Sequence, residues 1–129
     1  MRKKSLLIPY DKHTKRIFLQ DRRTYRKPDW GFFGGGIKEG ESVIEALIRE
    51  TQEELNITIT LESVHFLGTY IADYGGVQAQ RHFFLYPTIE TTYTVCEGEG
   101  IWVTFEKAKS LLDVAEDFSS IMELIAVVE

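Results

Sequence analysis

The chain of 129 residues has the composition of a globular domain, with 43% hydrophobic and 27% charged residues. Its formal net charge of -5 argues against nonspecific binding to nucleic acids, which depends on basic surface and counterion release. Cys96 is the single cysteine, which excludes an intrachain disulfide and a cysteine-rich zinc site and favours a cytoplasmic location. The apolar run near the start is too short for a signal peptide or a membrane span, so we expect no membrane partner.

The hydrophobic pattern predicts alternating strands and helices along the chain. Two early strands flank the polar turn DKHTK and are expected to form a hairpin. Two later segments rich in β-branched and aromatic residues flank the turn YGG. The predicted strands are 5–8, 16–21, a short strand within 22–36, 57–71, 77–89 and 101–105, and the predicted helices are 42–55, 106–112 and 118–127. This order favours an α/β fold, an α/β/α sandwich with a mixed sheet, and residues 1–129 are predicted to form one domain.

The segment Gly35–Ile57, GGIKEGESVIEALIRETQEELNI, places a glycine-rich turn before an acidic helix, with Ser42 as the expected N-cap. At about 100° per residue, Glu50, Glu53 and Glu54 fall within an arc of roughly 100° on one helix face. The adjacent arc is expected to pack on the sheet and contains Ile44, Ile48, Thr51 and Leu55. Neighbouring carboxylates repel each other, and a bound cation offsets this. Oxygen ligands without nearby Cys or His favour Mg2+, with Mn2+ as the second choice.

These residues resemble the Nudix box of MutT-like hydrolases, G-x5-E-x7-R-E-U-x-E-E-x-G-U, in which U is aliphatic. The residues at its defining positions are Gly35, Glu41, Arg49, Glu50, Glu53, Glu54 and Ile57. Two positions differ, because Thr51 stands at an aliphatic position and Asn56 at the closing glycine. Thr51 keeps a β-branched shape and Asn56 tolerates a left-handed conformation, so we expect the packing and the turn to survive.

The resemblance implies the same sandwich fold and a metal-dependent attack of water on phosphorus in a nucleoside diphosphate derivative. The implied metal ligands are the side chains of Glu50, Glu53 and Glu54 and the backbone carbonyl of Gly34. By the same resemblance, Arg49 orients a catalytic carboxylate. Gly35 and Glu41 are expected to support the ligands from the turn.

The general base is left open between two sources. Glu53 is the leading candidate within the box. Some relatives use an acid from a distant loop instead, and here the segment CEGEGIW offers Glu97 and Glu99.

The expected partner is a small nucleotide. Arg23 offers a planar fork that matches phosphate oxygens, while Phe32 and Tyr74 are aromatic residues near turns that can stack on a base. The favoured activity is that of a MutT-like nucleoside triphosphate pyrophosphohydrolase, which releases a nucleoside monophosphate and pyrophosphate. The alternatives are hydrolysis of dinucleoside polyphosphates, ADP-ribose or nucleotide sugars, and a catalytically silent nucleotide-binding module. Relatives occur as monomers and as dimers, so a homodimer is left open.

Overall fold

A computed structural model describes the chain except residues 24–27, 75, 91, 113–114 and 129, and describes only the backbone of 72–74, 77, 115–117 and 128. Its strands are β1 (Arg2–Asp11), β2 (Arg16–Asp21), β3 (Trp30–Gly31), β4 (Phe33–Gly36), β5 (His65–Tyr74), β6 (Val77–Thr88) and β7 (Glu99–Thr104). Its helices are α1 (Val43–Leu55), α2 (Phe105–Leu111) and α3 (Ala115–Val128), with a 3-10 turn, η2, at Leu61–Ser63. Within the described residues, these strands form one mixed sheet of seven.

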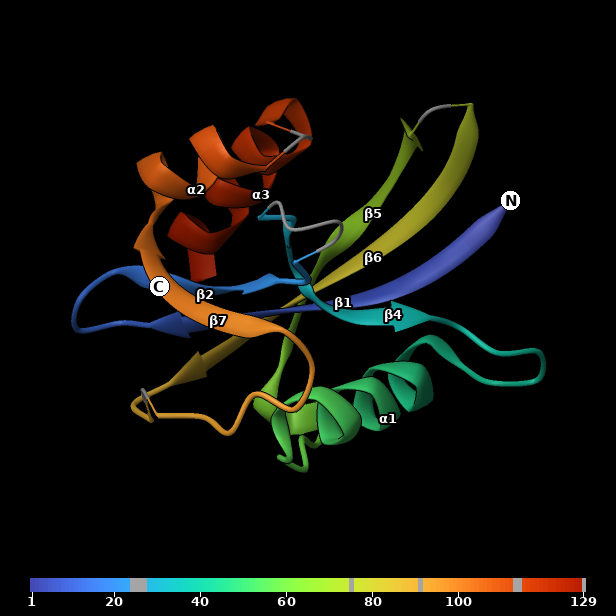
Figure 1. Ribbon diagram of the computed structural model, residues 1–129, viewed down its shortest axis with the longest axis horizontal. Helices are drawn as coiled ribbons and strands as arrows, with labels where there is room; N and C mark the ends of the chain where they lie inside the picture. Colours follow the sequence, from blue (N-terminus) through green and yellow to red (C-terminus); the bar gives the residue numbers. More distant parts are fainter. Residues whose placement is uncertain (24–27, 75, 91, 113–114, 129) are drawn as a thin grey trace.

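The sheet lies between two layers of helices. Figure 1 shows α1 on one face, with α2 and α3 on the other. This arrangement confirms the predicted α/β/α sandwich with a mixed sheet. None of the helices described has both the length and the apolar character that a membrane span requires.

The sheet divides where β1 and β2 separate. Strand β1 pairs in parallel with β6 along its full length, but it pairs with β2 only at Tyr10 and Asp11. Beyond this point β4 takes the free edge of β1, and β3 pairs with the far end of β2. The other edge of β2 pairs with β7. Strand β4 packs against the helix α1, and Gln20, near the end of β2, contacts the helix residue Glu54.

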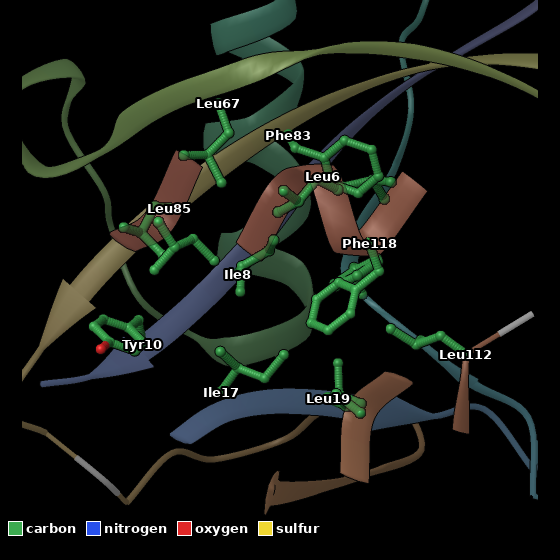
Figure 2. Packing of buried hydrophobic residues seen from close by; sticks show 14 of the residues in the cluster. Leu6, Ile8, Tyr10, Ile17, Leu19, Leu67, Phe83, Leu85, Leu112 and Phe118 are labelled. Carbon is green, nitrogen blue, oxygen red and sulfur yellow. The ribbon is translucent and has the colours of Figure 1, made fainter. Parts of the chain in front are cut away.

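Each face of the sheet has its own apolar cluster, because side chains alternate along a strand. On β1, Leu6, Ile8 and Tyr10 point toward α2 and α3, where they pack with Phe118 in the cluster of Figure 2. The intervening Leu7 belongs to the opposite cluster, under α1. The two apolar clusters thus hold the sheet between the two helix layers. The cluster under α1 also packs this helix, which carries the acidic residues, against the strands.

The ends of α1 follow the sequence prediction. The Ser42 hydroxyl accepts a hydrogen bond from the Glu45 amide at 3.1 Å, and the Glu45 carboxylate accepts one from the Ser42 amide at 3.0 Å. This reciprocal pair satisfies two amides at the start of the helix. Asn56 ends the helix in the left-handed conformation, with φ 54° and ψ 38°, as expected for a residue in place of glycine.

The buried side of α1 is rotated from the predicted one. Leu47, Thr51 and Leu55 are buried, whereas Ile44 and Ile48 are only half-buried. Thr51 fits this apolar face because its hydroxyl donates to the Leu47 carbonyl at 2.9 Å, one turn earlier. The sheet therefore covers a face that includes part of the predicted acidic arc.

Residues 57–64 correct another prediction, since they do not extend β5 as the apolar pattern indicated. The Thr60 amide donates to the Ser63 hydroxyl at 2.9 Å, and the Ser63 amide donates to the Thr60 carbonyl at 3.1 Å. These local bonds compete with strand pairing and produce the short turn η2. Pairing with β6 begins only at His65, opposite Leu85.

Candidate active site

Glu54 is a buried carboxylate where α1 meets the ends of β2 and β4. Its residue is 3% exposed, although it belongs to an acidic helix. The Gly34 amide donates to one carboxylate oxygen at 2.6 Å, and the Gln20 amide nitrogen donates to the other at 3.3 Å. The pKa of Glu54 is raised to about 7, chiefly by burial; the hydrogen bond from the Gly34 amide opposes this rise, and the negative charge of Glu50 adds to it. A divalent cation beside this pair of carboxylates would stabilise their ionised forms.

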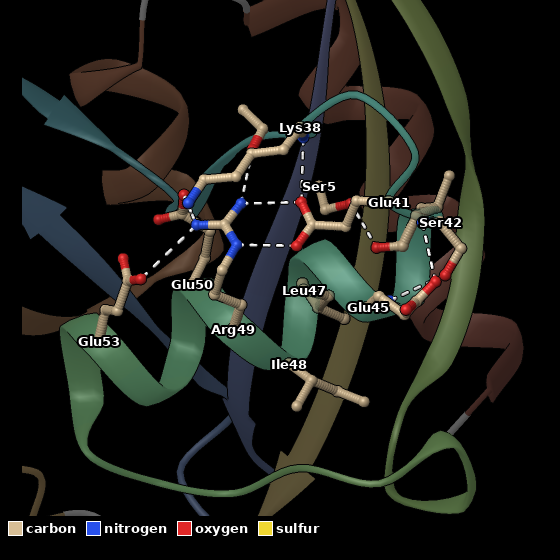
Figure 3. A network of polar contacts seen from close by, with 12 residues as sticks. Ser5, Lys38, Glu41, Ser42, Glu45, Leu47, Ile48, Arg49, Glu50 and Glu53 are labelled. Carbon is tan, nitrogen blue, oxygen red and sulfur yellow. Dashed lines mark hydrogen bonds and ion pairs between the residues drawn. The ribbon is translucent and has the colours of Figure 1, made fainter.

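Arg49 connects the helix to the turn before it, as Figure 3 shows. Its guanidinium donates to both carboxylate oxygens of Glu41, at 2.8 and 2.9 Å, and to Glu50 at 2.9 Å. It also donates to the Gly36 carbonyl at 2.9 Å. Hydrogen bonding from Arg49, with help from the Lys38 amide, lowers the pKa of Glu41 to about 2. The predicted contact between Arg49 and a carboxylate is present, while its catalytic role stays a prediction.

The glycine-rich turn allows two close approaches that a side chain would block. Gly34 has φ +121°, and a Cβ atom there would collide with the Ser5 carbonyl on β1. A Cβ atom on Gly35 would lie 2.8 Å from the carboxyl carbon of Glu50. Glycine at these two positions therefore lets β4 pair with β1 and lets Glu50 lie directly on β4.

The loop Cys96–Gly98 is held beside Glu54 by contacts of its backbone. The Cys96 amide donates to the Glu54 carbonyl at 2.7 Å, and Gln20 donates to the Glu97 carbonyl at 2.9 Å. Gly98 has φ +72°, and a Cβ atom there would collide with the Asp21 carbonyl. The structure thus brings Glu97, which is exposed, to the edge of the acidic segment.

Arg23 and Glu99 were predicted separately as a substrate ligand and a catalytic acid, but here they bind each other. Their side chains form an exposed ion pair at 2.7 Å, and Arg23 also lies 3.3 Å from Asp21. Glu97 follows Cys96, whose amide bonds to the Glu54 carbonyl, and its own carbonyl accepts a hydrogen bond from Gln20. The roles predicted for Arg23 in substrate binding and for Glu99 in catalysis remain predictions.

The structure corrects the prediction for Phe32. Its residue is 2% exposed, and its ring packs in the core at 5.2 Å from Phe83 and 6.0 Å from Phe118, measured between ring centroids. A ring enclosed in this way has no face on which a base can stack. Tyr74 is the last residue of β5, opposite Val77, and its side chain lies outside the described residues, so its role stays a prediction.

The three predicted acidic ligands do not lie together in this structure. Across the described ranges of the chain, no three His, Cys, Asp or Glu side chains gather closely enough to hold a metal ion. Glu54 is buried, Glu50 is bonded to Arg49, and the Glu53 side chain is 58% exposed and 3.7 Å from Arg49. These side chains nevertheless suit a hard cation, because their donor atoms are all carboxylate oxygens. A cation would also offset the repulsion between Glu50 and the buried Glu54. The contact of Glu53 with Arg49 is long, and its carboxylate faces solvent.

Gln20 is a member of this site that the sequence prediction missed. It is 0% exposed, and it contacts both Glu54 and the loop Cys96–Gly98. Its signal in the sequence is a polar residue within the apolar strand segment IFLQD. On β2 it shares the α1 face with the buried Phe18, where alternation calls for an apolar residue.

Comparison with known proteins agrees with this geometry. Residues 2–124 match the family described as the NUDIX domain, so the chain belongs to the Nudix family. This confirms the resemblance that the acidic segment carries. Over 46 residues the chain is 46% identical to the nucleoside triphosphate pyrophosphatase/Nudix hydrolase fusion protein of Bifidobacterium longum (strain NCC 2705). That match covers 36% of this chain but only 9% of the length of the fusion protein.

Solved structures of the same fold cover nearly the whole chain. The dihydroneopterin triphosphate pyrophosphohydrolase of E. coli superposes with a TM-score of 0.77 at 23% identity, covering 94% of this chain and 92% of that one. A binary complex of the C. elegans Ap4A hydrolase gives 0.80 at 23% identity, with 99% and 98% covered. The MutT protein of Methanosarcina mazei Go1 gives 0.77 at 17% identity, with 99% and 95% covered. At these identities the similarity establishes the fold.

Proposed function

We propose that this chain is a divalent-metal-dependent hydrolase of nucleoside diphosphate derivatives, with nucleoside triphosphates as its favoured substrates and a nucleoside monophosphate and pyrophosphate as products. Nudix hydrolases act on phosphorus-containing anhydrides and generally need divalent metal ions. The observation that carries the proposal is the buried Glu54 beside Glu50, with the Glu54 carboxylate held by the Gly34 amide and the Glu50 carboxylate held by Arg49. Repelling acids kept in fixed positions are typical of a site that gathers cations.

In this proposal Glu50 and Glu54 hold the metal ions, with the Gly34 carbonyl and Glu53 as further ligands. Their oxygen donors favour Mg2+, and Mn2+ is the expected substitute. A bound ion would neutralise phosphate charge and make its water a stronger nucleophile. Arg49 keeps Glu50 against the turn through its bonds to Glu41 and Gly36.

The chain offers candidates for the remaining tasks of the reaction. Glu53 is exposed and only weakly tied to Arg49, and Glu97 lies on a loop bound to the helix end, so these two are the proposed general bases. Arg22 is exposed, and its guanidinium donates to the Phe32 carbonyl at 3.1 Å, two residues before Gly34, whose amide binds Glu54. A guanidinium at that position suits the phosphate groups of a substrate.

The named relatives bear on the class of substrate. Two of them are named for triphosphate substrates, the fusion protein as a nucleoside triphosphate pyrophosphatase and the E. coli structure as a dihydroneopterin triphosphate pyrophosphohydrolase. These names support a triphosphate. The Ap4A hydrolase structure supports the second candidate, a dinucleoside polyphosphate.

A substrate panel tests the proposal directly. The pure protein is incubated with Mg2+ and canonical or oxidised nucleoside triphosphates, dinucleoside polyphosphates, ADP-ribose and nucleotide sugars, and all phosphate-containing products are quantified. We expect pyrophosphate and a monophosphate from a triphosphate. Glu54→Gln is expected to lower kcat by about a hundredfold or more, while Glu62→Gln, an exposed glutamate in η2, serves as the control. Nucleotide binding without turnover on the whole panel would instead support the silent module.

A further inference from the structure

Gln20 is a buried polar residue that joins three parts of the site. It lies near the end of β2, on the face that packs against α1, and it is 0% exposed. A primary amide enclosed in this way is costly unless its polar atoms are hydrogen-bonded. The amide nitrogen of Gln20 is hydrogen-bonded, whereas its amide oxygen has no partner among the described residues.

The amide nitrogen of Gln20 makes two hydrogen bonds to parts of the chain that are far apart in sequence. One goes to the second carboxylate oxygen of Glu54 at 3.3 Å, and one goes to the Glu97 carbonyl at 2.9 Å. An amide nitrogen has two N–H donors, so both are used. Because the Gly34 amide already bonds to the first oxygen of Glu54, both oxygens of this carboxylate are held by neutral donors.

The same contacts fix the loop that follows residue 95. The Glu97 carbonyl is held by Gln20, and the preceding amide of Cys96 donates to the Glu54 carbonyl at 2.7 Å. The next residue, Gly98, lies against the Asp21 carbonyl, directly after Gln20 on β2. The Gln20 side chain thus links this loop to the carboxylate of Glu54, beside the backbone contacts that also hold the loop.

We propose that Gln20 is a positioning residue, which holds Glu54 and the loop Cys96–Gly98 in the arrangement that the proposed hydrolysis requires. A neutral amide is suited to this task, because it orients the carboxylate without neutralising its charge. A lysine or arginine there would compete with a metal cation for Glu54. The inference rests on the proposed function, but the placement of the loop can be measured without substrate or metal.

The test compares Gln20→Met with the unaltered chain. Methionine has a similar length and no hydrogen-bond donor, so both contacts are lost while the volume is nearly kept. Loss of a group that orients a metal ligand typically weakens metal binding by 10- to 100-fold, so we expect Mn2+ affinity to fall by at least about tenfold. We also expect kcat to fall by about tenfold with little change in KM, and the Cys96 amide to exchange hydrogen markedly faster in the metal-free protein.

The control is Thr51→Val, which also removes a buried polar group of α1. Among the described residues, the Thr51 hydroxyl bonds only to carbonyls of its own helix, at Leu47 and Ile48, so Mn2+ affinity and Cys96 exchange should stay at their normal values. If Gln20→Met does not fold, Gln20→Asn keeps the amide on a shorter stem and is expected to show the same losses.

The outcomes separate this inference from the proposed function. Normal Mn2+ affinity in the Gln20 variant, or normal exchange at Cys96, overturns the role of Gln20 whatever the activity of the chain. A uniform rise of exchange throughout the protein, with equal protection lost at distant amides, also overturns it, because that result indicates general destabilisation. Absence of turnover in the unaltered chain contradicts the proposed function alone, since the Cys96 exchange still decides the role of Gln20.

Discussion

Gly35→Ala tests whether the position of the Glu50 carboxylate, and not only its charge, is needed for activity. The added Cβ atom would lie 2.8 Å from the carboxyl carbon of Glu50 and 2.8 and 2.9 Å from its two oxygens. Ordinary contact begins at 3.4 Å, so the carboxylate must retreat by about 0.6 Å. Gly35 is not in the left-handed region, so the backbone accepts alanine without strain.

The magnitudes predict a loss of activity with little loss of stability. Weakening the ion pair between Glu50 and Arg49 lowers the free energy of unfolding by up to about 1 kcal/mol. Replacing glycine by alanine raises it by about 0.4–1 kcal/mol, because the unfolded chain has less conformational entropy. The free energy of unfolding should therefore change by less than about 1 kcal/mol. A misplacement of about 1 Å can cost a hundredfold in rate, so we expect kcat/KM to fall by about ten- to a hundredfold.

The assay measures kcat/KM on the best substrate of the panel, together with urea unfolding. Gly36→Ala is the matched control, because a Cβ atom there would meet no atom within 4 Å and the carbonyl that Arg49 binds is kept. Equal activity of the two alanine variants would refute the reasoning. A large loss of stability in Gly35→Ala alone would also refute it, since the activity loss would then reflect unfolding.

Further predictions concern charge, substrate binding and the helix end. The pKa of Glu54 is about 7 in the folded protein and 4.5 in the unfolded chain, so the folded state holds its proton more tightly. The unfolding free energy of the metal-free protein should therefore fall by up to about 3 kcal/mol as the pH rises from 4.5 to 7. Glu54→Gln should abolish this pH dependence in urea titrations. Arg22→Gln should raise KM by about tenfold with kcat nearly unchanged, whereas Arg16→Gln, an exposed arginine at the start of β2, should not; equal KM values would exclude Arg22 from substrate binding. Asn56→Ala should lower the unfolding free energy by about 1 kcal/mol because its φ is 54°, while Asn56→Gly should keep it within a few tenths; equal stability of the two would contradict the left-handed helix end.

The parts of the site that could be predicted from the sequence depend on neighbours along the chain. Ser42 and Asn56 mark the ends of α1 because capping and the left-handed turn are local properties of those residues. Arg49 reaches Glu41 and Glu50 because all three belong to one turn and one helix. Spacing within the acidic segment was therefore sufficient to identify it.

The remaining parts depend on contacts that spacing does not contain. Glu53 and Glu54 are adjacent in the sequence, yet only Glu54 faces the ends of β2 and β4, so one is exposed and the other buried. Phe32 lies in a glycine-rich segment that gives no indication of which face its ring takes, and the core buries it. Gln20 and Glu97 are 77 positions apart and meet only because β2 pairs with β7.

Glu50 and Glu54 are proposed to hold divalent ions together. A titration with Mn2+, followed by electron paramagnetic resonance of the free ion, tests this proposal without any assumption about substrate. The double variant Glu50→Gln, Glu54→Gln should bind Mn2+ at least about tenfold more weakly than the unaltered chain, while Glu62→Gln should bind it normally. Equal Mn2+ affinity in the double variant and the unaltered chain would contradict the account.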